Sequence, residues 1–233
     1  MGAIYLVRHG QASFGAEDYD QLSSLGAEQS RVLGFWIRHC NLKVDRVVMG
    51  GHERHRQTAK CCLAVPGKVP PESQWQVASG FSEFDMLEVV RRFRPELCDQ
   101  AAINSWLAST QDPRREYQNI FAPAFERWVK GEHNDYSESF ASFRTRCWQA
   151  LSALLEDTTP SLTTWVFTSG GPISAIVQHA LAIANERIAE LTWVLVNTGI
   201  TKLLYRPDGV RAATINQYAH LEQIGRAEWI TYR

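Results

Sequence analysis

The sequence predicts an α/β protein in which helices cover both faces of a mostly parallel mixed sheet, a three-layer α/β/α sandwich. Short apolar runs rich in strand-forming residues alternate with longer segments of helical periodicity over most of the 233 residues. The first run, IYLV, lacks polar alternation, which is typical of a strand buried on both faces of a parallel sheet. The last two runs are joined by a Pro-Asp-Gly turn, which indicates an antiparallel hairpin. The length suits one large domain, so we expect residues 1–233 to form a single domain.

The elements follow from this pattern in chain order. Residues 4–7 predict the first strand. A loop at residues 10–24 follows it and is longer than a simple connection requires. Apolar residues at helical spacing predict a helix from Leu25, capped by Ser23 or Ser24. Further strands are predicted at 44–50, 163–168, 192–197, 200–206 and 210–218, and further helices at 53–65, 139–155 and 173–183.

A helical insertion is predicted at about residues 84–136, where several helical patterns occur without a convincing strand. Two interpretations of its aromatic residues stay open. They can form the core between the helices, or they can form a lid or substrate wall beside the strand ends. The residues concerned are Phe93, Trp106, Tyr117, Phe121, Phe125 and Trp128.

The composition is that of an ordinary globular protein. A net charge of −1 gives no reason to expect a nucleic-acid or membrane partner. Five scattered cysteines without paired spacing indicate free thiols in a reducing compartment and no metal centre. The sequence shows neither a leader pattern nor an apolar stretch of membrane-spanning length, so we expect a cytoplasmic protein.

Polar residues follow three of the predicted strands. These are Arg8-His9-Gly10, the segment 50–54 that ends in Arg54, and Ser169-Gly170-Gly171. Parallel strands end at one edge of a sheet, so the three segments can meet there. Arginine matches two phosphate oxygens with its planar fork, and the amides at a helix start add further donors. A neutral imidazole beside a bound phosphate can attack the phosphorus and carry it covalently. The sequence therefore predicts a phosphate site with a histidine nucleophile.

These residues carry a resemblance to a known family. LVRHGQA, LSSLGAEQSRVLG and RHRQTA resemble the histidine phosphatase superfamily, also called phosphoglycerate mutase-like. FSEFD, FTSGGPISAI, NTGIT and NQYAHL extend the similarity over essentially the whole chain. The resemblance implies the phosphoglycerate mutase-like form of the α/β/α sandwich.

The resemblance also implies roles for individual residues. His9 would become the phosphohistidine, and Arg8 and Arg54 would hold the phosphoryl group. Glu83 resembles the proton donor to the leaving alkoxide, for which a raised pKa is expected. Glu83 can instead be a solvated loop carboxylate, and Asp85 is a rival donor.

The third strand end departs from the family pattern. Ser169 stands where the family has a histidine that touches the phosphate, and serine supplies a hydrogen bond but no charge. We expect Ser169 to act as a neutral donor with the Gly170 amide, at some loss of activity. His52 and His55 form a solvated helix start in one interpretation and a replacement cation in the other. The Gln11 amide can reach the phosphate or point to solvent.

The sequence thus favours a metal-independent, cofactor-free phosphatase that hydrolyses phosphomonoesters through phosphohistidine. The substrate would be a phosphorylated small molecule or a phosphoprotein. Mutase activity is a first alternative, although QASFGAEDYDQ lacks the Trp-Asn and Asn-Arg-Phe pattern of the cofactor-dependent mutases, and Gly15 stands where an asparagine is usual. A catalytically weak phospho-ligand or partner-binding protein is the second. Neither the particular substrate nor the oligomeric state follows from the sequence.

Overall fold

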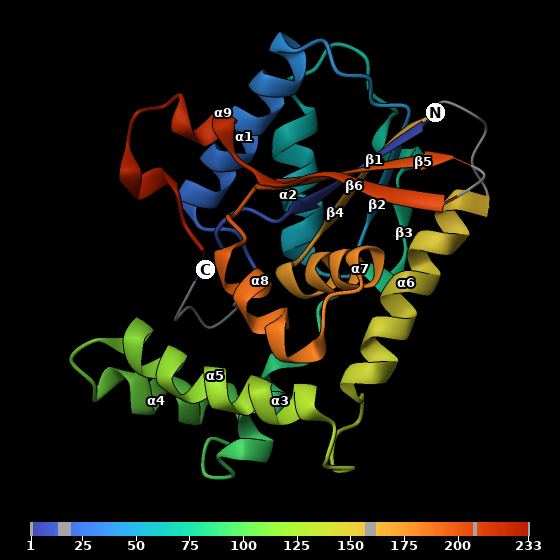
Figure 1. Cartoon of the computed structure of the whole chain (residues 1–233). Coiled ribbons are helices and arrows are strands. Elements are labelled where there is room, and N and C mark those ends of the chain that lie inside the picture. Colours follow the sequence, from blue (N-terminus) through green and yellow to red (C-terminus); the bar gives the residue numbers. More distant parts are fainter. Residues whose placement is uncertain (1, 14–19, 157–161, 207–208, 233) are drawn as a thin grey trace.

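One six-stranded sheet with helices on both of its faces organises the structure (Figure 1). The structure is a computed structural model that describes residues 2–13, 20–156, 162–206 and 209–232. The strand order is β3-β2-β4-β1-β5-β6. The strands are β1 (Gly2–Arg8), β2 (Arg46–Met49), β3 (Gln76–Val77), β4 (Thr163–Thr168), β5 (Ile200–Arg206) and β6 (Gly209–Gln217).

The parallel part of the sheet aligns the ends of its strands. β1 and β4 pair in parallel as far as Arg8 and Thr168, and β2 pairs with β4 as far as Met49 and Phe167. β5 runs antiparallel to β1, and β6 runs antiparallel to β5. The prediction of a mostly parallel mixed sheet is therefore confirmed. The carboxyl ends of β1, β2 and β4 meet at one edge, as the site hypothesis requires.

Two helical layers bury the two faces of the sheet. Successive residues of β1 point to opposite faces: Ile4 and Leu6 belong to one apolar cluster, and Tyr5 and Val7 belong to the other. One face is covered by α1 (Ser24–His39), α2 (Glu53–Leu63) and α9 (Ala219–Glu222), and the other by α6 (Phe140–Glu156), α7 (Gly170–Leu181) and α8 (Ile188–Val194). The predicted α1 cap is Ser23, whose hydroxyl accepts from the Gly26 amide.

The segment between β3 and α6 folds into three helices that lie farther from the sheet (Figure 1). They are α3 (Met86–Phe93), α4 (Gln100–Ala108) and α5 (Pro113–Lys130). Each begins at an aspartate, Asp85, Asp99 or Asp112, whose carboxylate accepts an amide of the first turn. No helix in the described ranges has the length and apolar character needed to span a bilayer.

The prediction of a strand at 192–197 is wrong. Residues 192–194 belong to α8, where the Thr192 hydroxyl donates to the Ile188 carbonyl. After α8 the backbone is held by the side chain of Asn216 in β6, which donates to the Val194 carbonyl and accepts the Val196 amide. β3, in turn, has only two residues and was too short to be recognised. In the predicted hairpin turn, residues 207–208 lie outside the described residues, as do 14–19 of the long loop.

The start of α1 presses against the loop that follows β1. A Cβ atom placed on Gly26 would lie 2.1 Å from the Gln11 carbonyl oxygen, and one on Gly10 would lie 2.3 Å from the Gly26 carbonyl oxygen. Both contacts are with backbone atoms, which cannot turn aside as a side-chain tip can. Glycine at these two positions is therefore a packing requirement, and it fixes the loop that carries His9.

We expect Gly26→Ala to lower the free energy of unfolding by about 1–3 kcal/mol, because the added methyl group forces two backbone segments apart. Urea denaturation followed by circular dichroism measures this change. Gly67→Ala is the matched control, since no atom lies within 4 Å of its added Cβ. Equal losses in the two variants would contradict the packing argument.

Candidate active site

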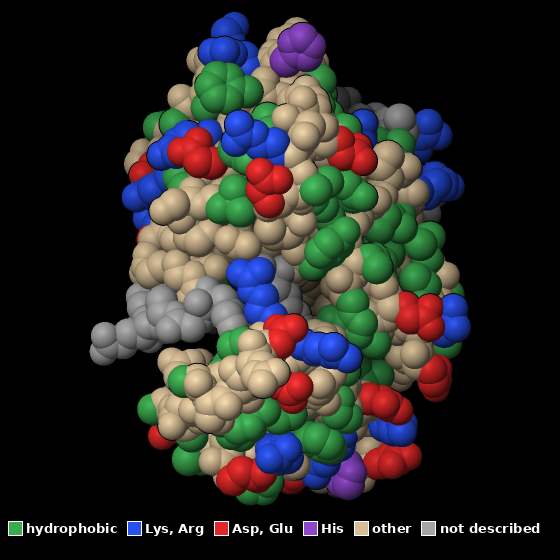
Figure 2. Space-filling view, turned by 90° about the vertical axis from the view of Figure 1, so that its left-hand side faces the viewer, with side chains coloured by type: hydrophobic (Ala, Val, Ile, Leu, Met, Phe, Trp, Pro, Cys, Tyr) green, Lys and Arg blue, Asp and Glu red, His purple; other side chains and the backbone are tan. Residues whose placement is uncertain are grey.

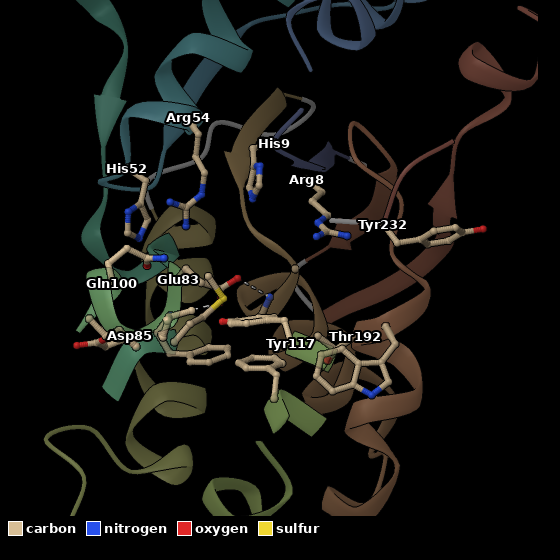
Figure 3. A pocket seen from close by; sticks show the side chains of 18 of the residues that line it. Arg8, His9, His52, Arg54, Glu83, Asp85, Gln100, Tyr117, Thr192 and Tyr232 are labelled. Carbon is tan, nitrogen blue, oxygen red and sulfur yellow. Dashed lines mark hydrogen bonds between the residues drawn. The ribbon is translucent and has the colours of Figure 1, made fainter. Parts of the chain in front are cut away.

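A pocket of about 400 Å³ lies at the carboxyl ends of β1 and β4. Arg8 and His9 reach it from the end of β1, and Arg54 reaches it from the first turn of α2. Glu83, which lies between β3 and α3, completes this group. Figure 3 shows Arg8, His9 and Arg54 pointing from one side toward Glu83 on the other. The structure thus brings together all four residues that the sequence analysis proposed for catalysis.

His9 is buried and held by its own backbone surroundings. Its Nδ1 lies 2.7 Å from the Gly10 carbonyl oxygen. A carbonyl oxygen only accepts, so Nδ1 carries the ring proton and Nε2 keeps its lone pair. The His9 amide donates to the Thr168 carbonyl, and its carbonyl accepts from the Asn197 side chain. Burial, and then the charges of Arg54 and Arg8, lower the pKa of His9 well below its usual value. The imidazole is therefore neutral and fixed, as a nucleophile must be.

Two guanidinium groups flank this imidazole. Arg8 donates to the Leu195 carbonyl through one Nη atom. Arg54 is almost fully buried, and its Nη1 donates to Asp20 over 2.7 Å. The pocket therefore holds positive charge next to a neutral nucleophile, an arrangement that favours a phosphate dianion.

Asp20 is a site residue that the sequence analysis missed. Besides pairing with Arg54, its carboxylate accepts the backbone amides of Glu53 and Arg54 at the start of α2. One carboxylate therefore caps the helix and orients the arginine. A signal existed: the residue at the N-cap of α2 is His52, which makes no side-chain cap, so an acceptor had to come from elsewhere.

The carboxyl group of Glu83 faces the phosphate site, and its burial favours the neutral form. Its Oε2 accepts the Gly171 amide at 3.2 Å, and its Oε1 accepts the Phe84 amide. A Cβ on Gly171 would lie 2.0 Å from Oε1, so only glycine leaves room for the carboxylate. Burial raises the pKa of Glu83, against the opposing effect of Arg54. The rival Asp85 is exposed and engaged in capping α3.

The remaining predicted residues lie in different surroundings. Gly170 lines the pocket, whereas Ser169 is fully buried beneath it and is hydrogen-bonded to His55 Nε2 over 2.7 Å. The interpretation of His55 as part of a solvated helix start is wrong, because His55 is also fully buried. His52 is half-buried and does line the pocket. Gln11 lines a second hollow, and its amide oxygen accepts from the Ser23 hydroxyl.

Within the described residues, no three histidine, cysteine, aspartate or glutamate side chains are grouped as metal ligands would be. On the face shown in Figure 2, basic and acidic side chains are interspersed and do not form a patch of one sign. The positive charges of Arg8 and Arg54 are concentrated inside the pocket.

Fold and site define a class, an α/β/α sandwich with a histidine and two arginines at the ends of parallel strands. The profile of the histidine phosphatase superfamily (branch 1) matches residues 4–218. The chain therefore belongs to the histidine phosphatase superfamily. No protein of curated function matches the sequence.

Several solved structures share the fold at low sequence identity. A phosphoserine phosphatase from Entamoeba histolytica superposes with a TM-score of 0.65 at 17% identity, over 95% of this chain and 100% of that one. A phosphoglycerate mutase from Bacillus anthracis gives 0.66 at 13% identity, over 97% of both chains. A mycobacterial glucosyl-3-phosphoglycerate phosphatase gives 0.62 at 16% identity, over 93% and 99%. Phosphatases and a mutase thus share this phosphoglycerate mutase-like fold.

We expect Asp20→Ala to weaken binding of tungstate, a phosphate analogue, by about tenfold, because Arg54 loses the hydrogen bond that orients it. Isothermal titration calorimetry at pH 6 measures the dissociation constant. The control is Glu72→Ala, which removes a carboxylate that pairs with another arginine of α2, Arg56, outside the pocket. Unchanged tungstate binding in Asp20→Ala would show that Arg54 needs no such support.

Proposed function

We propose that this protein is a phosphatase that hydrolyses phosphomonoesters through a phosphohistidine on His9. The observation that carries the proposal is the neutral His9 imidazole, held between two arginines and facing a carboxyl group whose pKa is raised. A mutase has the same first step, so the fate of the phosphoryl group distinguishes the two activities.

The first step transfers the phosphoryl group to the enzyme. The lone pair on His9 Nε2 attacks phosphorus, and the bond from phosphorus to the ester oxygen breaks. The proton of the Glu83 carboxyl group passes to that oxygen, so the product leaves as an alcohol. Arg8 and Arg54 stabilise the charge on the phosphoryl oxygens during the transfer.

The second step regenerates the enzyme. Glu83, now a carboxylate, takes a proton from a water molecule that attacks the phosphohistidine. The bond from nitrogen to phosphorus breaks, its electron pair returns to Nε2, and inorganic phosphate leaves. Glu83 is then protonated again and ready for the next substrate.

Two further properties belong to this proposal. The arginines and the amides at the start of α7 supply the positive charge that phosphate requires, and we therefore propose that catalysis needs no metal ion. We place the protein in the cytoplasm, which fits its five free cysteines.

We expect wild-type protein to release phosphate from p-nitrophenyl phosphate in the presence of excess EDTA, and to carry an acid-labile, alkali-stable phosphoryl group after a rapid quench. His9→Ala should abolish both signals, because it removes the imidazole that lies between Arg8 and Arg54. His179→Ala is the control, since His179 stacks on Trp148 outside the pocket.

Three results would contradict the mechanism: near-normal turnover in His9→Ala, activity that EDTA removes and a divalent ion restores, or tungstate binding without any turnover. The last result would favour a phospho-ligand-binding protein. Transfer of the phosphoryl group to a second substrate hydroxyl, without release of phosphate, would favour a mutase.

A further inference from the structure

The wall of the pocket opposite the phosphate site is apolar. Helices α3, α4, α5 and α8 contribute it, together with the segment before α3. Its side chains are Phe84, Met86, Leu87, Ile103, Leu107, Tyr117, Phe121 and Trp193. The rings of Tyr117 and Phe121 lie 5.7 Å apart and stack, and Trp193 meets Phe121 edge to face at 5.5 Å. The wall is therefore predominantly aromatic and aliphatic.

Charge is distributed unevenly over the same pocket. Among its described lining residues, arginine occurs only at positions 8 and 54, and lysine does not occur. The polar side chains of the wall are neutral, Gln100, Asn104 and Thr192, apart from the carboxylate of Asp85. A second anionic group on a substrate would meet apolar surface, neutral amide and hydroxyl groups or this carboxylate, and no second lysine or arginine to compensate its charge.

We propose that the pocket takes a phosphomonoester whose alcohol part is uncharged and hydrophobic. This inference rests on the proposed function and adds the substrate class to it. Burying each methylene of such an alcohol against the wall contributes about 0.8 kcal/mol, or about fourfold in affinity. Substrates with a carboxylate near the phosphate lose this contribution and also incur a desolvation cost.

The test is a series of butyl, hexyl and octyl phosphates, in which the leaving group keeps the same basicity while the chain grows. We expect kcat/KM to rise by up to about fourfold per methylene and to exceed, for octyl phosphate, the values for phosphoserine and 3-phosphoglycerate by at least about tenfold. Binding of butyl- and octylphosphonate, which cannot be hydrolysed, is measured in parallel by calorimetry.

Trp193→Ala should flatten the dependence on chain length in both measurements. Val194→Ala is the matched control, because Val194 is the next residue of α8, is 52% exposed and does not line the pocket. Met86→Gln is the second wall variant, should Trp193→Ala not fold.

The outcomes separate the two proposals. His9-dependent turnover with phosphoserine or 3-phosphoglycerate as the better substrate would overturn the substrate class and leave the phosphatase standing. Absence of turnover, with octylphosphonate binding more tightly than butylphosphonate, would overturn the phosphatase and leave the ligand class standing. A flat dependence on chain length in wild-type protein overturns the hydrophobic class in either case.

A second and independent inference concerns the start of α7. Ser169 is its N-cap residue, and a serine there ordinarily accepts an amide of the first turn. The third helical residue, Pro172, has no amide hydrogen, so Gly171 offers the available donor. The Ser169 hydroxyl makes no such cap bond and lies instead 2.7 Å from His55 Nε2, turned toward α2. The Gly171 amide donates instead to Glu83.

We propose that His55 is a positioning residue, which holds the Ser169 hydroxyl away from α7 and so reserves the Gly171 amide for Glu83. His55 and Ser169 are both fully buried, so water does not compete for their contact. The other ring nitrogen of His55, Nδ1, faces the backbone of Gly50. The imidazole is therefore oriented with Nε2 toward Ser169.

The hydrogen bond from Gly171 favours the carboxylate form of Glu83 and lowers its pKa relative to burial alone. Arg8 and Arg54 act in the same direction across the pocket, and Arg146 of α6 also faces this carboxyl group, next to Cys147. The half-buried His52, the N-cap residue of α2, is a further titratable group that lines the pocket. None of these groups changes in the variants below.

The test measures kcat/KM as a function of pH and compares the alkaline limb of the profile, where kcat/KM falls as pH rises, among the variants. The first step needs Glu83 protonated, so activity falls as pH rises through the pKa of Glu83. In His55→Ala the freed Ser169 hydroxyl can take the Gly171 amide, and the limb should shift to higher pH. The double variant His55→Ala/Ser169→Ala removes the competing hydroxyl and should return the limb to the wild-type position. Ser169→Ala alone should leave the limb in place.

A purely structural role for His55 predicts the same limb in His55→Ala and in the double variant, and that result would overturn the proposal. His55→Phe, which keeps a ring but makes no hydrogen bond to Ser169, is the second variant, should His55→Ala not fold. Titration of a ¹³C-labelled Glu83 carboxyl group by NMR gives the same comparison without turnover.

Discussion

The parallel pairing of β1 with β4 is the constraint on which the rest of the site depends. It continues to Arg8 and Thr168, and the His9 amide then donates to the Thr168 carbonyl over 2.8 Å. The histidine therefore leaves the sheet at a fixed point, beside the turn that starts α7. Asn197 holds the His9 carbonyl from a third segment. Because β1 lies inside the sheet and its apolar residues are buried on both faces, the nucleophile is attached to a strand that packing holds from both sides.

Burial of charge gives this site its chemical character. A guanidinium as buried as Arg54 requires compensation, and Asp20 provides part of it. Burial, together with the positive charges of Arg54 and Arg8, lowers the pKa of His9, and burial raises the pKa of Glu83. Both groups are thus shifted toward the neutral forms that the proposed first step needs.

The pocket has two structural origins. Its polar floor consists of Arg8, His9, Arg54, Gly170 and Gly171, which lie at the end of β1 and at the starts of α2 and α7. The helices between β3 and α6 supply most of its apolar wall. The positions of the floor residues depend on the register of the sheet strands, so we expect substitutions there to be poorly tolerated. The wall rests on side-chain packing among helices and can vary without disturbing the nucleophile.

Local patterns in the sequence are enough to specify most of the sheet and the polar floor. Continuous apolar runs predict β1, β2 and β4, and because parallel strands end at one edge, the meeting of Arg8, His9 and Arg54 follows from the order of the elements. Glu83 is recognised through a resemblance, since nothing in the residues around it separates it from Asp85. The helix cap that Asp85 provides becomes visible in three dimensions.

Contacts between residues distant in sequence decide the remainder. Residues 192–194 carry strand formers, yet they are helical, and the side chain of the distant Asn216 binds the backbone that follows them. Asp20 acts on Arg54 across 34 positions, and His55 meets Ser169 across 114. The wall of the pocket is likewise assembled from four helices whose apolar residues resemble ordinary core. Local sequence patterns determine which helices and strands form. The partner of each buried polar group depends on how these elements pack together, and a local pattern contains no information about that packing.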